Sequence, residues 1–183
     1  MTEPSPDPST SVPRVTFVLG GARSGKSTHA ERLAADYCAR NGQSAIYLAT
    51  GQARDGEMAD RIAQHRARRS AVWQTIEAPI DIVTTLTNAP KGTTILVDCL
   101  TLWLSNLMET DRDLPHEFKR LTDCLQSVAG SVILVANEVG LGIVPDNQLA
   151  RRFRDHAGLL NQTVAACADQ VLFITAGLPM RLK

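Results

Sequence analysis

The stretch VTFVLGGARSGKST, residues 15–28, decides the fold that we expect for this chain. Its opening letters, VTFVLG, are almost continuously apolar, which is typical of a strand buried on both faces. The letters GGARSGKS at positions 20–27 match the pattern G-x-x-x-x-G-K-[ST] in full, and a helical pattern follows them. A strand, this loop and a helix in that order predict a phosphate-binding loop.

The residues of this loop suit a bound chain of phosphates. Its glycines let the backbone curl so that successive N–H groups point inward, and the start of a helix adds the positive end of its dipole. Lys26 supplies a charge for the β- and γ-phosphates, and the Ser27 hydroxyl suits Mg²⁺. The alternative is a glycine-rich turn with an incidental lysine. We expect nucleotide contacts from Gly20, Gly21, Ala22, Arg23, Ser24, Gly25, Lys26 and Ser27, with Lys26 also catalytic.

Apolar strand patterns alternate with helical patterns along the rest of the chain. Strands are expected at Val15–Gly20, Ser44–Thr50, Thr93–Leu100, Ser131–Glu138 and Gln170–Gly177, with weaker signals at Val72–Ile76 and the C-terminus. Helices are expected at Ser27–Arg40, Glu57–Arg69, Ile80–Asn88, Leu100–Glu109, Glu117–Val128 and Asn147–Ala168, with a break at Asp111–Pro115 and an interruption at Gly158. This alternation predicts an α/β fold of the P-loop NTPase type, with a mostly parallel sheet and helices on both faces.

Length, composition and charge limit the organisation of the chain. Its 183 residues are about one domain's worth, and no repeat or internal linker is visible. Residues 1–13, rich in Pro and Ser, are expected to form a disordered tail, and residues 14–183 a single P-loop domain. Nineteen Lys and Arg balance nineteen Asp and Glu, so the chain lacks the basic excess of proteins that coat nucleic acid or membranes.

Further features predict a cytoplasmic protein. No apolar run reaches the roughly 18 residues that a membrane span needs. The N-terminus has no basic start followed by an apolar stretch, so we expect no secretory signal. The cysteines each fall in an apolar segment and form no CxxC pair, which predicts buried, reduced thiols and no disulfide framework or zinc site. They are Cys38, Cys99, Cys124 and Cys167.

A candidate metal ligand follows the predicted strand that contains ILV. Asp98 ends this run, and a carboxylate in that position accompanies the loop serine at the Mg²⁺ site of many nucleotide enzymes. Both Gly20 and Asp98 lie at the carboxyl ends of predicted strands, where open α/β sheets bind ligands. We therefore expect Ser27 and Asp98 to hold Mg²⁺. The alternative is that Asp98 caps the next helix.

A histidine among arginines is a second candidate. On the expected helix, His65 shares an apolar stripe with Met58 and Ile62, while Arg61 and Arg69 lie about one turn away on either side. Nearby guanidinium groups disfavour the imidazolium, so the ring should stay neutral and nucleophilic, able to attack the α-phosphorus of a nucleotide. The alternative is a packed histidine on a basic helix end. His29, His116 and His156 are weaker candidates.

A glycine-containing loop, Asn137–Asn147, leaves another buried strand at its carboxyl end, where a second substrate could lie. In it Glu138 is a candidate general base or metal neighbour, with loop anchoring as the alternative. Arg151, Arg152 and Arg154 follow on the next helix, where a solvated face, a subunit contact or a phosphorylated substrate would each explain them.

From the residues alone, a P-loop small-molecule kinase without nucleotidyl transfer and a nucleotide-gated binding module both remain open.

Four stretches together resemble one family. They are LGGARSGKSTHAE, AT-G-x6-M-x2-RI-x2-H-R, LVDCLTLWLSNL and NEVGLGIVPDNQLARRFRDHAG-x2-NQ. The chain resembles, from about Val15 to Lys183, the bifunctional adenosylcobinamide kinase/adenosylcobinamide-phosphate guanylyltransferases of cobalamin biosynthesis. The last stretch is the most specific, because P-loops occur in many families.

The resemblance implies a two-step enzyme. It would phosphorylate adenosylcobinamide with a nucleoside triphosphate, ATP or GTP, and then pass GMP from GTP through a guanylylated histidine to adenosylcobinamide phosphate. The guanylylated histidine carries over to His65, and family members are trimers. Besides the loop, the family's nucleotide contacts carry over to Ala49, Thr50, Gly51, Arg66, Ala67, Arg68, Arg69, Glu77 and Asp98.

The chain departs from the family pattern at two positions. Some members have two adjacent histidines, and here Gln64 precedes His65, which leaves one candidate. Gly51 stands where a serine is common, so no hydroxyl contact is available there. Aromatic residues make up only 4% of the chain, which favours an open groove for the corrinoid over an aromatic box.

Overall fold

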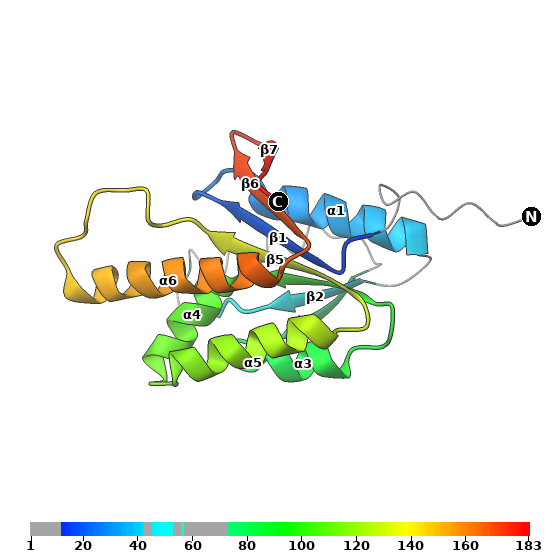
Figure 1. Cartoon of the computed structure of the whole chain (residues 1–183), viewed down its shortest axis with the longest axis horizontal. Coiled ribbons are helices and arrows are strands. Elements are labelled where there is room, and N and C mark those ends of the chain that lie inside the picture. Colours follow the sequence, from blue (N-terminus) through cyan, green and yellow to red (C-terminus); the bar gives the residue numbers. More distant parts are fainter. Residues whose placement is uncertain (1–11, 42–44, 53–55, 57–72) are drawn as a thin grey trace, which may run out of the picture.

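The computed structural model describes residues 12–41, 45–52, 56 and 73–183 (Figure 1). Its strands and helices alternate for most of the chain, as the sequence predicts. In chain order they are β1 (Val15–Gly20), α1 (Lys26–Asn41), β2 (Ala45–Ala49), β3 (Trp73–Glu77), α3 (Ile82–Asn88), β4 (Thr94–Asp98), α4 (Leu100–Glu109), α5 (Leu114–Ser127), β5 (Ser131–Asn137), α6 (Gln148–Cys167), β6 (Gln170–Thr175) and β7 (Leu178–Arg181).

The strands form one seven-stranded sheet in the order β3-β2-β4-β5-β1-β6-β7. Neighbouring strands from β3 to β6 run parallel, and β7 alone pairs antiparallel, with β6. The parallel sheet is therefore confirmed, and the two weaker strand signals are β3 and β7. Because β1 is central and buried along its whole length, the loop after it leaves from the middle of the sheet.

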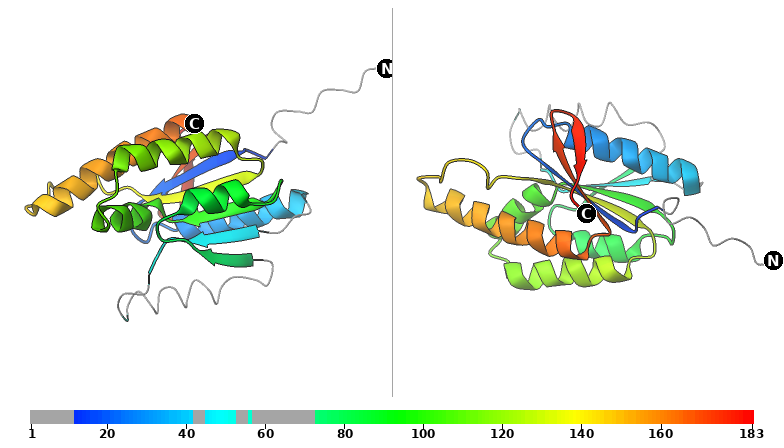
Figure 2. Two further views of the ribbon diagram at one scale, coloured as in Figure 1. Left: turned by 90° about the horizontal axis from the view of Figure 1, so that it is seen from below. Right: turned by 45° about the horizontal axis from the view of Figure 1, so that its top comes forward.

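Helices pack on both faces of the sheet, which confirms the predicted layers (Figure 2). Side chains alternate along β1, so Phe17 points to one layer of core and Val18 to the other. The core with Phe17 is covered by α3, α4, α5 and α6, and includes the fully buried Trp103. The core with Val18 is covered by α1. The helix that starts after the phosphate loop thus lies alone among the described helices on its face.

Two predicted helix boundaries are wrong. Helix α5 begins at Leu114, because Asp113 accepts from the backbone N–H of His116 and Pro115 is tolerated in the first turn, where no donor is needed. Helix α6 is continuous through Gly158. A helical glycine costs only about 1 kcal/mol, which burial of the neighbours Ala157 and Leu160 against the sheet can offset.

Some predictions fall outside the described residues. The tail, apart from residues 12 and 13, and the predicted helix Glu57–Arg69 are among them. The boundary between tail and domain stays a prediction. Within the part of the chain that the structure describes, no helix has the length and apolar character needed to cross a membrane.

Candidate nucleotide site

The loop between β1 and α1 folds tightly back on itself. The backbone N–H of Ser24 donates to the carbonyl of Gly21 at 3.3 Å, and Nζ of Lys26 donates to the same carbonyl at 3.0 Å. Arg23 and Gly25 both have positive φ, at 56° and 94°. Helix α1 follows at once, with His29 N–H donating to the carbonyl of Gly25. The chain thus forms a strand, a curled loop and a helix start, as the motif predicts.

Glycine is required where the loop leaves the sheet. A Cβ atom at Gly20 would lie 2.5 Å from both the carbonyl oxygen of Ile174 and Oγ of Ser24, which is closer than real side chains come. Oγ of Ser24 is itself buried and has no hydrogen-bond partner within the described residues. This hydroxyl lies against the start of the loop, next to Gly20.

Asp98 ends β4 at the same edge of the sheet. It is half-buried, and one of its oxygens, Oδ2, accepts a hydrogen bond from the Tyr47 hydroxyl at 3.0 Å. Tyr47 and Leu96 both belong to the core under α1, and Asp98 follows Leu96 by two positions, so its side chain lies on the face that α1 covers. Ser27, in the first turn of α1, belongs to that same face.

The alternative role for Asp98, capping the next helix, is wrong. The N-cap residue of α4 is Cys99 and not Asp98, and the Cys99 side chain makes no capping hydrogen bond. The carboxylate instead points to Tyr47. Burial, with a smaller effect of the Asp98 charge, raises the pKa of the Cys99 thiol to about 11, so the thiol stays protonated at neutral pH.

The expected contacts beyond the loop reach this edge too. Ala49 and Glu77 end β2 and β3 side by side, and Ala49 is also paired with Asp98. A Cβ at Gly51 would lie 3.3 Å from a methyl group of Leu102, so a serine there would need a small shift of that side chain. Gly20, Ala49, Glu77 and Asp98 thus share the carboxyl edge of the sheet.

A buried polar network lies behind Asp98. Thr50 Oγ1 donates to the Cys99 carbonyl and accepts from the Cys99 N–H, both at 2.8 Å. From α4, the side-chain amide of Asn106 donates to the carbonyls of Thr50 and Pro79, each at 2.9 Å. Because Asn106 donates to both carbonyls, it ties together the two chain segments that leave β2 and β3.

His29 is buried one turn into α1, and Arg32 Nη2 donates to its Nδ1 at 3.0 Å. A guanidinium has only donors, so Nδ1 accepts and the neutral ring carries its proton on Nε2. Burial and then the Arg32 charge lower the pKa of His29. His29 is therefore a neutral, enclosed histidine.

The loop after β5 starts beside the phosphate loop. Glu138 N–H donates to the carbonyl of Gly20 at 3.1 Å, and Oε1 of Glu138 accepts from the N–H of Gly140. This second contact is the loop anchoring that the sequence left as the alternative. The loop then exposes Leu141, Ile143 and Val144 as it runs to α6.

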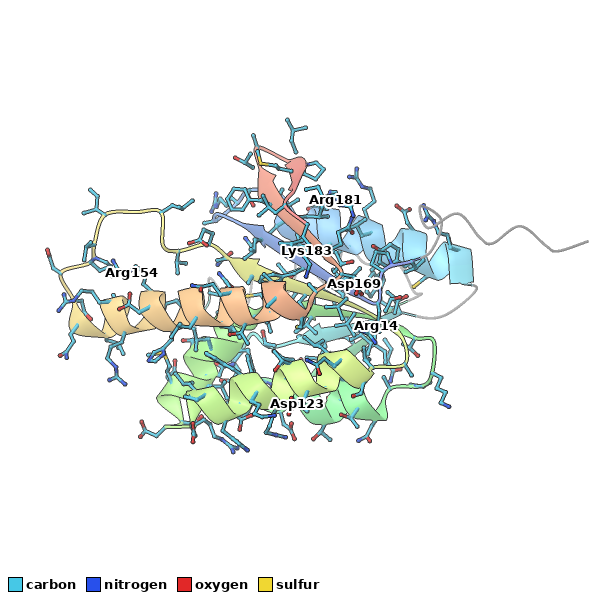
Figure 3. All side chains as sticks on the ribbon, in the orientation of Figure 1. Arg14, Asp123, Arg154, Asp169, Arg181 and Lys183 are labelled. Atoms are coloured by element: carbon cyan, nitrogen blue, oxygen red, sulfur yellow. The ribbon has the colours of Figure 1, made fainter. Side chains whose placement is uncertain are left out.

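The arginines after this loop contact their own neighbours. Arg151 donates to the carbonyls of Pro145 and Asp146, which closes the turn into α6. Arg154 pairs with Asp155 at 2.9 Å near the free end of the helix (Figure 3). Within one chain, these two side chains therefore have partners of their own.

Several predicted site residues lie outside the described residues: His65, Arg66, Ala67, Arg68 and Arg69. Among the described residues, no group of three or more His, Cys, Asp or Glu side chains is placed to hold a metal ion. Cys38, Cys99 and Cys124 are buried free thiols, as expected, and Cys167 is half-buried.

Sequence reasoning missed Tyr47 and Asn106. A tyrosine within a strand that is otherwise buried needs a partner for its hydroxyl, and an asparagine inside the apolar pattern LTLWLSNL needs partners for its amide. Both signals were available. Neither could identify the partner, because Asp98 and Tyr47 are 51 positions apart.

Comparison with known proteins identifies the family. Residues 16–182 match the family model of cobinamide kinase / cobinamide phosphate guanyltransferase. The chain is 52% identical over 170 residues to the bifunctional adenosylcobalamin biosynthesis protein CobP of Pseudomonas aeruginosa, a match that covers 91% of this chain and 96% of that one. It is 41% identical over 184 residues to CobU of Salmonella typhimurium, covering 91% and 98%.

A solved structure agrees on the fold. The flagellar accessory protein FlaH from Methanocaldococcus jannaschii superposes with a TM-score of 0.54 over 94% of this chain and 80% of that chain, at 13% identity. This likeness concerns the P-loop fold alone. With the family model and the two relatives, the chain belongs to the cobinamide kinase / cobinamide phosphate guanyltransferase family, and it is a nucleotide-binding enzyme of cobalamin biosynthesis with both activities.

Proposed function

We propose that the chain first phosphorylates adenosylcobinamide with a nucleoside triphosphate held on residues 20–27. It then transfers GMP from GTP to the new phosphate through a guanylyl-His65 intermediate, which gives adenosylcobinamide-GDP. The observation that supports this most is that Gly20, Ala49, Glu77 and Asp98 share one edge of the sheet. Backbone donors, an ammonium and a carboxylate at one edge suit a triphosphate.

The donor set at this edge fits Mg²⁺. Mg²⁺ prefers hard oxygen ligands, and Asp98 offers a carboxylate on the face of the sheet that the helix carrying Ser27 covers. Tyr47 holds one carboxylate oxygen, which orients the other. We infer that Ser27 and Asp98 bind the ion, which would neutralise charge on the β- and γ-phosphates. Lys26 would act on the same phosphates.

The guanylyl transfer needs two displacements at phosphorus. A nitrogen of neutral His65 attacks the α-phosphorus of GTP, a P–N bond forms, the bond to the bridging oxygen breaks, and pyrophosphate leaves. A phosphate oxygen of adenosylcobinamide phosphate then attacks the same phosphorus, and the P–N bond breaks to release the imidazole. The support for His65 is the stretch RIAQHR within the sequence, with arginines around it.

A mass measurement tests this assignment. After incubation with GTP and Mg²⁺, the intact chain should gain one GMP, and peptide mapping should place it on His65. His65→Ala should lose the adduct and keep the kinase step. His116 is an exposed histidine on α5, so His116→Ala serves as the matched control and should still gain the GMP. Kinase turnover without any adduct would support the simple kinase, and nucleotide binding without turnover would support the binding module.

Two further expectations rest on the family. We infer a homotrimer, with sites near the subunit junctions, and a cytoplasmic enzyme. Analytical ultracentrifugation should give three times the mass of one chain. A monomer at concentrations where the enzyme is active would contradict the trimer. Competition between ATP and GTP in the kinase assay would identify the donor of the first step.

A further inference from the structure

The turn between β6 and β7 lies directly on the phosphate loop. Residues Ala176 and Gly177 form this turn with positive φ, at 50° and 78°. The N–H of Gly177 donates to the carbonyl of Ser24 at 2.9 Å. The right-hand view of Figure 2 shows the hairpin beside the connection from β1 to α1. A segment more than 150 positions away in the chain therefore contacts the loop through its backbone.

The hairpin approaches the phosphate loop closely at two points. A Cβ at Gly25 would lie 3.2 Å from Cα of Gly177, and a Cβ at Gly20 would lie 2.5 Å from the carbonyl oxygen of Ile174. Gly20 begins the phosphate loop and Gly25 lies near its end. The last residues of β6 and the turn after them therefore support the loop at two separate points.

This contact determines which way one peptide group of the loop faces. In a trans peptide, the carbonyl of one residue and the N–H of the next point in opposite directions. The carbonyl of Ser24 accepts from Gly177, so the N–H of Gly25 points away from the hairpin. An N–H in that position is a donor for a phosphate oxygen.

We propose that Gly177 is a positioning residue for nucleotide binding: its N–H holds the Ser24–Gly25 peptide with the Gly25 N–H toward the phosphates. Without this bond, the peptide could rotate and present the Ser24 carbonyl, which would repel a phosphate. The proposal rests on the assignment of residues 20–27 as the phosphate site. It adds the C-terminal hairpin, which the motif does not contain, to that site.

Substitutions at Gly177 test the proposal, because its φ of 78° excludes some side chains more than others. Gly177→Val strains the turn, and we expect the dissociation constant and KM for the triphosphate to rise about tenfold, with kcat changed less. Gly177→Asn should stay within about twofold of the wild type, because asparagine tolerates this conformation. Open space surrounds a Cβ there, so a clash does not account for the difference.

Leu178→Ala is the matched control, since it alters the next residue, which is 69% exposed, and keeps the turn. It should bind GTP like the wild type. Isothermal titration with GTP and Mg²⁺ gives the affinities, and thermal unfolding confirms that each variant is folded. If Gly177→Val does not fold, Gly177→Ala replaces it, and the shift of the Gly25 amide resonance in ¹⁵N-labelled protein is the second measurement.

Two outcomes overturn the proposal. One is a folded Gly177→Val or Gly177→Ala variant with wild-type affinity and an unmoved Gly25 resonance. The other is a Leu178→Ala variant that binds as weakly as Gly177→Val. The Lys26→Ala variant distinguishes a failure of this proposal from a failure of the phosphate site itself. If residues 20–27 bind the phosphates, the affinity of this variant for GTP should fall. Unchanged affinity in Lys26→Ala would contradict the site, whatever Gly177 does.

Discussion

The hydroxyl of Tyr47 donates a hydrogen bond to Oδ2 of Asp98 at 3.0 Å, between neighbouring strands on the face of the sheet that α1 covers. This bond occupies one oxygen of the carboxylate and leaves the other at the carboxyl edge. A buried strand residue thereby fixes the orientation of the acidic group that we propose for Mg²⁺. Charge-assisted bonds of this kind are the stronger hydrogen bonds in proteins.

Tyr47→Phe removes this bond with little change in packing. We expect the free energy of unfolding to fall by about 1–2 kcal/mol and the Mg²⁺ concentration for half-maximal kinase activity to rise, because the carboxylate is no longer held. Magnesium titrations of both activities measure the second effect. Tyr37→Phe is the control, since its hydroxyl bonds to Thr16 at 3.3 Å, at the opposite end of the strands. Equal Mg²⁺ dependence in both variants would contradict the role of Tyr47.

Asn106→Leu leaves two backbone carbonyls, of Thr50 and Pro79, without their donor. Since an unsatisfied buried polar group costs about 1–3 kcal/mol, we expect the free energy of unfolding in urea to fall by about 2–4 kcal/mol. Ser105→Ala, one position earlier on α4, loses only a long contact of 3.4 Å with Glu109 and should change stability by less than about 0.5 kcal/mol. Similar losses in both variants would show that the network is not what stabilises this edge.

The loop around Gly20 could be predicted because its geometry follows from adjacent residues. The spacing of glycines, lysine and serine in the motif is local, and the strand before it is apolar throughout. Strand β3 gave only a weak signal because it is an edge strand and its side chains are partly exposed. Periodicity detects burial best, so edge elements are the hardest to predict.

The contacts that complete the site could not be predicted, because they join distant parts of the chain. Nothing near Gly177 indicates that its N–H meets Ser24, and nothing near Tyr47 indicates Asp98. The continuity of α6 through Gly158 likewise depends on packing against the sheet. Sequence patterns show which residues need partners, and only the fold supplies those partners.

Cys99 should make the protein less stable in alkali. Burial raises the pKa of this thiol from 9.0 to about 11, so between these pH values the unfolded chain releases a proton that the folded chain keeps. More protons are then bound in the folded state, and stability falls as pH rises, by about 2–3 kcal/mol across the window. The contribution is fully present below about pH 9.

Urea unfolding measured between pH 8 and 11 tests this effect. The pH range covers the shift of the Cys99 thiol pKa from 9.0 to about 11. Cys99→Ala should show a smaller loss of stability over the same range. Part of the loss should remain, because burial also raises the pKa of Tyr37 and of Cys167. If the free energy of unfolding falls equally steeply with pH in Cys99→Ala and in the wild type, the loss of stability does not come from Cys99.

Glu138 offers a test of two roles that differ in what they require of the side chain. Its Oε1 accepts from the N–H of Gly140, and its own N–H donates to the carbonyl of Gly20. Anchoring needs an acceptor, and a glutamine supplies one. A general base needs a carboxylate that takes up a proton. We therefore expect Glu138→Gln to keep kinase activity within about threefold of the wild type, whereas loss of a general base costs about 100-fold or more.

Glu138→Ala completes the comparison, because it removes the acceptor altogether. We expect it to lower kcat/KM for the corrinoid more than Glu138→Gln does, since the loop after β5 then loses its contact with Gly140 beside the phosphate loop. Steady-state kinetics on both variants give the order of effects. If Glu138→Gln is as damaging as Glu138→Ala, the carboxylate itself is needed, and Glu138 acts in the chemistry and not only in the structure of the loop.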